Sequence, residues 1–288
     1  MYRFGKYHGI GNDFIVVDLR NASAAEIAGV TSVGKASQVC DRRRGVGADG
    51  ILAILPPTSS GALAEMVVVN ADGSRAEMCG NGIRCVAKYL FENDSLAKPS
   101  LTIDTGAGPL TCELTTKEKT VSSVLVNMGA PRFERTEIPM EGSGTLLDQK
   151  VPALGTDLRF SAVSMGNPHI VTFVEESGDA LMNMAKALGP KLESASIFPE
   201  RTNVEFAHAH SPTKIEVVVW ERGSGITQAC GTGACATVVA ACKTDRVKID
   251  TDTTVDLPGG ALLIRVSPDY EYVNMTGPVV HVFDGSFS

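Results

Sequence analysis

The chain has 288 residues, of which 43% are hydrophobic and 20% are charged, and its formal charge at pH 7 is −7. Its length and composition are those of a globular protein with enough apolar surface for one large domain or two medium ones. The negative charge, with Arg42-Arg43-Arg44 as the one basic run, argues against nucleic acids and anionic membrane surfaces as partners.

Strands dominate the expected secondary structure. Short runs rich in Val and Ile, bounded by Gly, Pro, Asn or Asp, are the signal of a strand. The chain carries such runs at 14–18, 51–55, 65–70, 101–105, 121–128, 170–174, 203–207, 214–220, 261–266 and 279–283.

Fewer segments are expected to be helical. Apolar residues recur with the helical period over 83–91, which predicts an amphipathic helix, whereas 234–242 is apolar nearly all round and predicts a helix buried on every side. Two further helices are predicted near 31–40 and 180–193. The stretch 135–156, rich in Gly, Pro and polar residues, is the predicted linker.

Two stretches of the chain resemble each other, NADGSRAEMCGNGIRCVA at 70–87 and ERGSGITQACGTGACAT at 221–237. Both read Gly-Ser, a short polar spacer, Cys-Gly-x-Gly and then an apolar helix, with Cys79 and Cys230 lying 151 residues apart. Weaker similarities recur at nearly the same offset, pairing 11–17 with 166–172 and Asp49 with Asn203. Several similarities at one shared offset predict a duplicated fold with one thiol in each half.

The Cys-Gly-x-Gly motif suits acid/base chemistry. A thiol at the start of a helix lies beside the positive end of the helix dipole, so we expect its pKa to fall below the ordinary value of about 8.5. The glycines let an anion approach the first N–H groups of the helix. Two such sites facing one ligand would remove a proton from one face of a carbon and deliver one to the other, while both helices hold a shared carboxylate. This predicts inversion of a stereocentre by Cys79 and Cys230, without a cofactor.

Other classes of protein are disfavoured by the sequence. No signal peptide and no run of about 18 apolar residues is found, and the seven scattered cysteines form no CxxC pair, so we expect reduced thiols in the cytoplasm. The stretch 45–50, GVGADG, fits a dinucleotide fingerprint but leads into a strand pattern, so no nucleotide site is expected. His208 and His210 lack a third ligand, so no metal site is expected either.

Seven motifs resemble those of the diaminopimelate epimerase family, the pyridoxal-independent enzymes that interconvert LL- and meso-diaminopimelate in lysine and peptidoglycan-precursor synthesis. In family order they are GIGNDFIVVD, GVGADG, NADGSRAEMCGNGIRC, GNPH, FPERTNVEF, WERGSGITQACGTGACA and GPVVHVFDG, and they extend from residue 9 to residue 285. The resemblance implies an α/β (α+β) fold of two pseudo-symmetric halves, each a mixed, barrel-like sheet around a central helix, with the active site in the cleft between them. The halves would be 1–130 plus 277–288, and 131–276.

The resemblance also implies roles for residues around the two thiols. Those that would hold the distal, non-reacting amino-acid end of the substrate are Asn12, Asn70, Asn167, Asn203, Glu221 and Arg222. Those that would hold the reacting carboxylate are Gly80, Asn81, Gly231 and Thr232. His169, together with Glu221, would tune the ionisation of the thiols. Gly50 stands where some relatives carry glutamine, so a side-chain contact there would be missing.

Two alternatives remain open at this point. A proline or hydroxyproline racemase of the same fold would use the same two thiols, although those relatives typically carry histidine where this chain has Asn81. A thiol-redox regulatory protein would instead join Cys79 and Cys230 in a reversible disulfide. The expected partner is a small-molecule substrate, with no nucleic acid and no membrane, and the oligomeric state stays open, a homodimer included.

Overall fold

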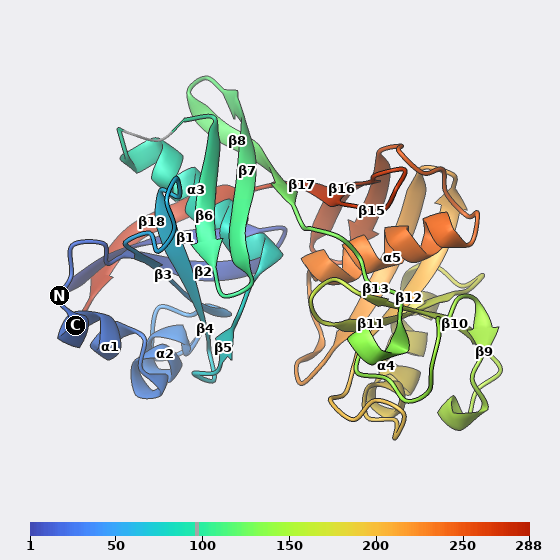
Figure 1. Ribbon diagram of the computed structural model, residues 1–288. Coiled ribbons are helices and arrows are strands. Elements are labelled where there is room, and N and C mark those ends of the chain that lie inside the picture. The colour runs from blue at the N-terminus through green and yellow to red at the C-terminus, as the bar shows by residue number, and fades with distance from the viewer. Residues whose placement is uncertain (96–97) are drawn as a thin grey trace. The chain divides into compact units, whose positions relative to one another are not determined.

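The computed structural model describes residues 1–95 and 98–288 and divides into two compact units (Figure 1). Unit 1 comprises Met1–Asn127 and Thr276–Ser288, and unit 2 comprises Met128–Met275. Because the end of the chain returns to unit 1, strand β17 (Val273–Pro278) carries the boundary between the two.

Unit 1 is built mainly from strands, with helices inserted at two points of the chain. Its helices are α1 (Ala24–Val30), α2 (Val33–Cys40) and α3 (Gly80–Asn93). Its strands are β1 (Tyr2–Gly9), β2 (Asn12–Asp18), β3 (Gly50–Leu55), β4 (Ala64–Asn70), β5 (Arg75–Ala76), β6 (Ser100–Thr105), β7 (Gly108–Lys117), β8 (Thr120–Asn127) and β18 (Val280–Phe287).

Unit 2 has a similar succession of elements. Its helices are α4 (Gly178–Glu193) and α5 (Gly231–Lys243), with short 3-10 turns at Arg135–Glu137 and Pro152–Leu154. Its strands are β9 (Gln149–Lys150), β10 (Arg159–Ser164), β11 (Pro168–Phe173), β12 (Asn203–Ser211), β13 (Lys214–Glu221), β14 (Gly225–Ile226), β15 (Thr253–Leu257) and β16 (Gly260–Val266).

The strand pairings of the two units follow one scheme. In unit 1, β1 is antiparallel to β2, β2 parallel to β3, β3 antiparallel to β4, β4 parallel to β6, and β6 antiparallel to β7. In unit 2 the same five relations hold for β10–β11, β11–β12, β12–β13, β13–β15 and β15–β16. Matching order and direction along so many strands confirms the predicted duplication and the mixed sheets.

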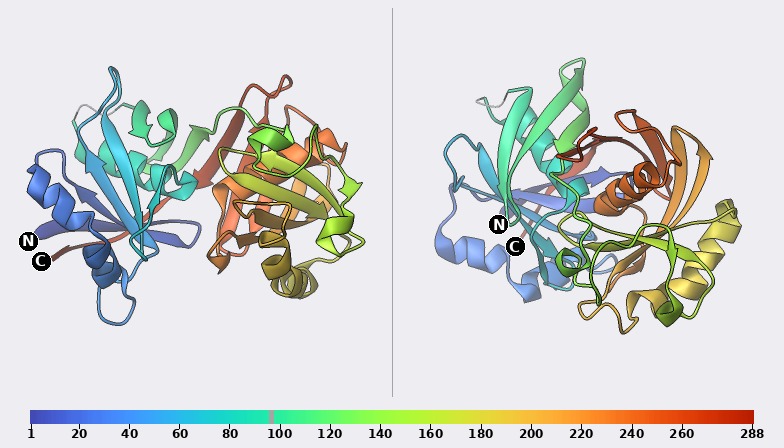
Figure 2. Two further views of the ribbon diagram at one scale, coloured as in Figure 1. Left: turned by 60° about the horizontal axis from the view of Figure 1, so that its bottom comes forward. Right: turned by 45° about the vertical axis from the view of Figure 1, so that its right-hand side comes forward.

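Each unit places one helix at the centre of its sheet (Figure 1, Figure 2). Helix α3 contacts β1, β2, β3, β4, β6, β7 and β8, and helix α5 contacts β10, β11, β12, β13, β15 and β16. Helices α1, α2 and α4 cover the other face of these sheets, where β3 packs against α2 and β12 against α4. Because both faces are covered, β3 is buried along nearly its whole length and β12 over its first five residues, and β3 reads as a nearly continuous apolar run.

The outer face of each sheet packs into an apolar core. In unit 1, Ile51 and Ala53 of β3 pack with Val30, Ala36 and Val39 of the covering helices. In unit 2, the members that share the core with α4 include Phe160, Ile170, Leu181, Ala185, Val204 and Phe206. Alternate residues of β3 and β12 therefore face the cores, and the residues between them, Leu52 and Glu205, face the central helices.

All ten predicted strands and the helices at 83–91, 234–242 and 180–193 are confirmed. The helix predicted near 31–40 begins only at Val33, because Ser32 caps a new helix there, and α1 before it was not predicted. The predicted linker 135–156 is wrong. Ile138, Met140 and Leu146 are buried in the unit 2 core, so this stretch is an irregular but packed part of the domain.

Candidate active site

Cys79 lies at the N-terminus of the central helix of unit 1. It is the N-cap residue of α3, in extended backbone conformation, and its Sγ accepts a hydrogen bond from the backbone N–H of Gly82 at 3.3 Å. The thiol is half-buried. An N-cap normally uses an oxygen of Ser, Thr, Asp or Asn, so a sulfur in this role puts a reactive group where the N–H groups of the first turn converge.

Asn12 connects this thiol to the polar residues around it. Its Oδ1 lies 4.0 Å from Cys79 Sγ and accepts from Asn81 Nδ2 at 3.1 Å, while its Nδ2 donates to Asp49 Oδ2 at 2.7 Å. Asp49 in turn pairs with Arg42 at 2.7 Å. Asn12, Gly80 and Asn81 are thus brought together with Cys79. Asp49 was not predicted as a site residue, and Arg42, taken from sequence as part of a basic run, is held in ion pairs.

Asn70 and Gly50 lie opposite each other on neighbouring strands of unit 1. The Asn70 amide donates to Ser74 Oγ at 3.0 Å. A Cβ atom on Gly50 would lie 2.7 Å from the carbonyl oxygen of Val69, so the strand has no room for a side chain at this position. A contact from a glutamine there would require a different local backbone.

Arg84, a residue that sequence reasoning did not single out, is fully buried in α3. Its guanidinium donates to the carbonyl oxygen of Gly80 at 3.0 Å and to Asn81 Oδ1 at 2.8 Å. It therefore braces the first turn of α3 from behind. The available signal was a charged residue within 83–87, a stretch otherwise apolar on every helical face.

Cys230 has the equivalent position in unit 2. It is the N-cap of α5, its Sγ accepts from the N–H of Gly233 at 3.3 Å, and its side chain is buried. Thr232 Oγ1 lies 3.5 Å from the sulfur. The two Cys-Gly-x-Gly motifs thus fold in the same way, as the repeat predicts.

The pKa of Cys230 is raised well above its ordinary value by burial and by the carboxylates of Glu221 and Glu205, which outweigh the hydrogen bonds from Thr232 and Gly233. The expectation that the helix terminus lowers this pKa is therefore wrong for Cys230. Desolvation disfavours the charged thiolate more than the helix dipole favours it.

A chain of polar contacts extends from Cys230 into unit 2. Asn167 Nδ2 donates to Thr232 Oγ1 at 3.3 Å, and Asn167 Oδ1 lies 2.9 Å from His169 Nε2. The other ring nitrogen, Nδ1, lies 2.7 Å from Glu205 Oε1, and both His169 and Glu205 are fully buried. Glu205 was not predicted from sequence, although it is the one charged residue in the apolar stretch VEFA.

Asn203, Glu221 and Arg222, which were also predicted for unit 2, lie at the start of β12 and at the end of β13. Asn203 donates to the carbonyl oxygen of Pro168 at 2.9 Å and accepts from the backbone N–H of Arg222 at 2.9 Å. The Arg222 side chain donates to the carbonyl oxygen of Glu200. Burial raises the pKa of Glu221, an effect that hydrogen bonds with Thr227 and Cys230 partly offset. Glu221 therefore lies against Cys230, and Arg222 extends from the turn after it.

The strand register corrects one detail of the predicted repeat. Phe14 pairs with Gly50 in unit 1, and His169 pairs with Asn203 in unit 2. Since Phe14 and His169 are equivalent by the 155-residue offset, Asn203 corresponds to Gly50 and not to Asp49. By the same register, Glu205 corresponds to Leu52.

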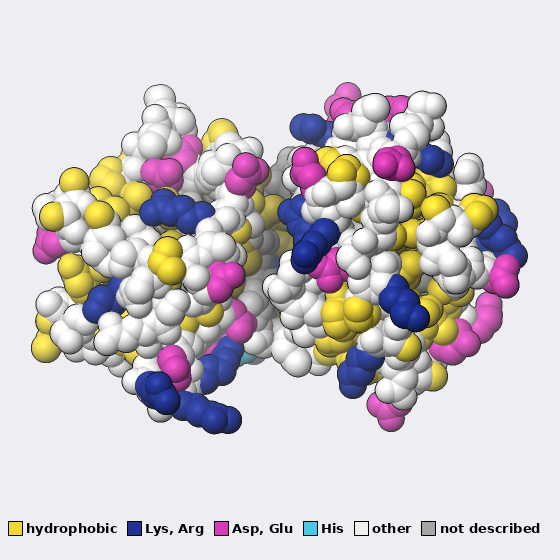
Figure 3. Space-filling view, turned by 90° about the horizontal axis from the view of Figure 1, so that it is seen from below, with side chains coloured by type: hydrophobic (Ala, Val, Ile, Leu, Met, Phe, Trp, Pro, Cys, Tyr) yellow, Lys and Arg dark blue, Asp and Glu magenta, His cyan; other side chains and the backbone are white. Residues whose placement is uncertain are grey.

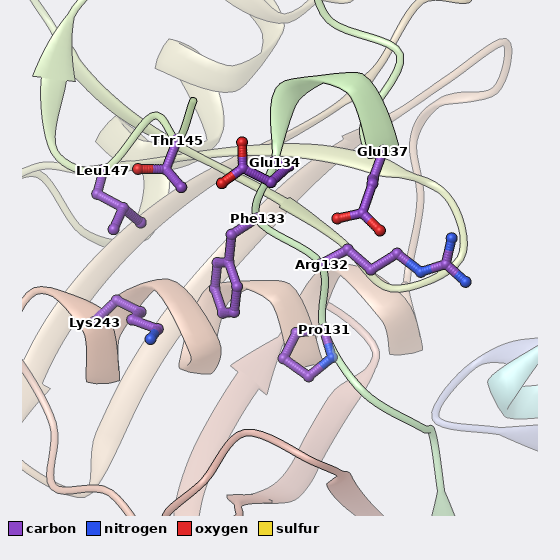
Figure 4. A pocket seen from close by; sticks show the side chains of 8 residues that line it. All are labelled: Pro131, Arg132, Phe133, Glu134, Glu137, Thr145, Leu147 and Lys243. Carbon is purple, nitrogen blue, oxygen red and sulfur yellow. The ribbon is translucent and has the colours of Figure 1, made fainter. Parts of the chain in front are cut away.

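One hollow of unit 2 lies away from the Cys230 thiol (Figure 4). It has a volume of about 380 Å³ and is lined by Pro131, Arg132, Phe133, Glu134, Glu137, Thr145, Leu147 and Lys243. Lys243 is the last residue of α5, whereas Cys230 caps its first turn, so the two are separated by roughly 20 Å of helix. The Lys243 ammonium lies 3.7 Å from the centre of the Tyr270 ring. This hollow takes no part in the thiol site.

The surface charge agrees with the overall composition. On the face shown in Figure 3, Lys and Arg side chains are interspersed with Asp and Glu side chains over both units. None of the helices formed by residues 1–95 and 98–288 has the length and apolar character needed to cross a membrane.

Comparison with known proteins identifies the family. The family model described as diaminopimelate epimerase matches residues 4–134 and 161–282. The chain is 45% identical over 285 residues to the diaminopimelate epimerase of Moorella thermoacetica and 45% identical over 285 residues to that of Pelotomaculum thermopropionicum, covering 99% of this chain and 98% of each relative. The fold is similar to a solved hydroxyproline epimerase from Agrobacterium vitis, with a TM-score of 0.68 at 15% identity, covering 99% of this chain and 90% of that one. The chain therefore belongs to the diaminopimelate epimerase family.

Proposed function

We propose that the protein is a cofactor-independent diaminopimelate epimerase, which converts LL-diaminopimelate to the meso isomer with Cys79 and Cys230 as its acid/base pair. One observation carries the proposal. In a duplicated fold of this family, both thiols cap a central helix and accept a glycine N–H at the same distance of 3.3 Å. Two groups of equal chemistry and equal local geometry suit a reaction that must run in both directions.

The inversion then needs one proton transfer on each face of the α-carbon. One cysteine, as the thiolate, removes the α-proton and becomes a thiol, while the other cysteine donates its thiol proton to the opposite face and becomes a thiolate. The reverse reaction exchanges the two roles. The reacting carboxylate lies against the first turns of α3 and α5, at Gly80, Asn81, Gly231 and Thr232, whose N–H groups stabilise the negative charge that develops.

The distal end of the substrate determines specificity in this proposal. The residues assigned to it are Asn12, Asn70, Asn167, Asn203, Glu221 and Arg222. Arg222 supplies a cation for the distal carboxylate and Glu221 an anion for the distal ammonium, and a site built around such groups strongly rejects a substrate that lacks them. His169 and Glu221 in addition tune the thiols, in keeping with the effect of Glu221 on the pKa of Cys230.

In this proposal the bound substrate is shielded from water, because water would solvate the thiolate and weaken the hold on the carboxylate. An enzyme whose two reacting cysteines must stay thiols suits the cytoplasm, where thiols are kept reduced.

The test is proton NMR of the reduced protein in heavy water with LL-diaminopimelate. The α-proton signal should disappear as the meso isomer forms, and Cys79→Ala and Cys230→Ala should each abolish epimerisation. Parallel samples with L-proline and with hydroxyproline separate the substrates. Exchange with proline or hydroxyproline alone would discard the diaminopimelate assignment and keep the two thiols. No exchange with any of them would mean that the thiols are not an acid/base pair, and a redox role would be tested next.

A further inference from the structure

Unit 2 contains a continuous chain of polar contacts, and its two buried members have apolar counterparts in unit 1. It links Glu205 to His169 at 2.7 Å, His169 to Asn167 at 2.9 Å, Asn167 to Thr232 at 3.3 Å and Thr232 to Cys230 at 3.5 Å. Glu205 and His169 are fully buried. This series of polar contacts therefore begins at the buried carboxylate of Glu205 and ends at the thiol of Cys230.

The duplication shows that the fold does not require the buried end of this chain. The positions equivalent to His169 and Glu205 are Phe14 and Leu52 in unit 1. Leu52 and Glu205 each lie against the first turn of the central helix of their unit. A Cβ atom added to Gly82 of α3 would lie 2.9 Å from Leu52, and one added to Gly233 of α5 would lie 2.9 Å from Glu205. A buried carboxylate at a position where the fold accepts leucine destabilises the protein unless other groups compensate its charge. Packing therefore does not explain why a glutamate stands at position 205, whereas a role in the thiol site does.

The direction of the hydrogen bonds follows from the chemistry of the groups. A carboxylate only accepts, so Glu205 requires a proton on Nδ1 of His169. In the observed arrangement the amide of Asn167 accepts at Oδ1 from Nε2 and donates at Nδ2 to Thr232. His169 then donates from both nitrogens as a cation, and the Thr232 hydroxyl is left to donate to a thiolate at Cys230.

Turning the Asn167 amide over reverses every bond of the chain except the one to Glu205. The thiol of Cys230 then donates to Thr232, Thr232 to Asn167, and Asn167 to a neutral His169. The two arrangements hold the same number of protons, one on sulfur or one on Nε2.

We propose that Glu205 is a positioning residue, which keeps Nδ1 of His169 protonated and thereby couples the direction of the hydrogen bond at Cys230 to the charge of His169. This inference rests on the proposed function, because it concerns one of the two thiols assigned there. Glu205 makes and breaks no bond in the reaction. It acts only through His169, Asn167 and Thr232.

The charged groups around Cys230 make the proposal testable by the sign of an effect. They are Glu221 on β13, Glu205 on β12 and His169 on β11. If Glu205 acted only as a negative charge across space, its removal would favour the thiolate of Cys230. If it acts by supporting the cationic His169, its removal disfavours that thiolate.

The experiment measures alkylation of Cys230 by iodoacetamide against pH, in the full chain, by peptide mass spectrometry with Cys79 as the internal reference. In Glu205→Gln, alkylation of Cys230 at neutral pH should be about 10- to 100-fold slower, since one hydrogen bond to a charged group is lost. The rate at Cys79 should stay within about twofold. Glu205→Asp, which keeps the charge, should recover part of the rate. Faster or unchanged alkylation of Cys230 would overturn the proposal.

Two further variants distinguish an effect transmitted through the polar contacts from a general loss of structure. Glu216→Gln removes another histidine-bonded carboxylate of unit 2, which lies 3.1 Å from His210, and should leave the Cys230 rate unchanged. In a His169→Asn background, Glu205→Gln should cause no further slowing, because the group through which it acts is gone. A further slowing in that background would contradict the proposal.

A measurement on the wild-type protein keeps the proposal falsifiable if Glu205→Gln does not fold. With ¹⁵N-histidine labelling, the His169 ring signals are assigned among the five histidines by their loss in His169→Asn. Nδ1 should stay protonated across the pH range over which Cys230 titrates. An unprotonated Nδ1 would overturn the inference. Absence of α-proton exchange in the wild type would instead overturn the proposed function, since the alkylation experiment needs no substrate.

Discussion

Gly189→Ala probes how helix α4 supports the turn that carries Arg222. An added Cβ at Gly189 would lie 2.5, 2.6 and 2.7 Å from three atoms of Trp220, so the indole must move. Trp220 Nε1 donates to Glu193 Oε2 at 2.8 Å, and Glu193 Oε1 accepts from the backbone N–H of Gly223 at 2.9 Å. Displacing the indole therefore strains the contacts that hold the turn after Glu221.

The magnitude follows from three contributions. Overpacking a filled core costs about 1–3 kcal/mol. Loss of the indole–carboxylate bond costs about 1.5–3 kcal/mol, because one partner is charged. Replacing glycine by alanine within a helix returns about 0.5–1 kcal/mol. We expect a decrease of about 1.5–5.5 kcal/mol in the free energy of unfolding of unit 2, with a KM for diaminopimelate that rises more than kcat falls.

The assay is urea unfolding followed by tryptophan fluorescence, which reports on unit 2 because Trp220 is the single tryptophan of the sequence. Asn183→Ala is the matched control, since Asn183 is exposed on the same helix and its replacement should stabilise α4 by a few tenths of a kcal/mol. A Gly189→Ala protein whose unfolding free energy lies within about 0.5 kcal/mol of the wild type would refute the reasoning, because the clash would then be relieved without loss.

Two further predictions concern binding and acid stability. Arg222→Met should raise KM for diaminopimelate by about 10- to 100-fold, because a charged hydrogen bond to the substrate is lost. The control Arg265→Met, which breaks an exposed ion pair with Asp252, should leave KM unchanged. Equal KM values for the two variants in steady-state kinetics would contradict the assignment of Arg222. Burial raises the pKa of Asp104, but hydrogen bonds from Ser59 and Thr58 outweigh this effect and lower the pKa below its ordinary value. The ionised carboxylate therefore stabilises the fold above about pH 4, and this stabilisation is lost as the pH falls further. Circular dichroism during acid titration should show this loss in the wild type and a shallower one in Asp104→Asn; identical profiles would remove Asp104 as its source.

Some strands could not be predicted from the local pattern. The strands at 2–9, 108–117 and 253–257 carry polar or alternating residues and few consecutive Val or Ile, and they form because neighbouring strands pair with them. The stretch 135–156 has the composition of a linker, yet scattered apolar residues, among them Ile138, Met140 and Leu146, anchor it in the unit 2 core. Local composition does not report contacts made far along the chain.

The candidate site, too, has one part that the sequence predicts and one part that depends on the tertiary structure. The sequence by itself determined the duplicated fold and the paired thiols, because Cys-Gly-x-Gly before an apolar helix is a local signal and its repeat needs no structure to be recognised. Only the tertiary structure decided what surrounds those thiols. Burial with Glu221 and Glu205 raises the pKa of Cys230, and the His169–Glu205 pair joins strands β11 and β12. Electrostatic effects depend on distance and desolvation, and both arise only when residues far apart in the chain are packed together.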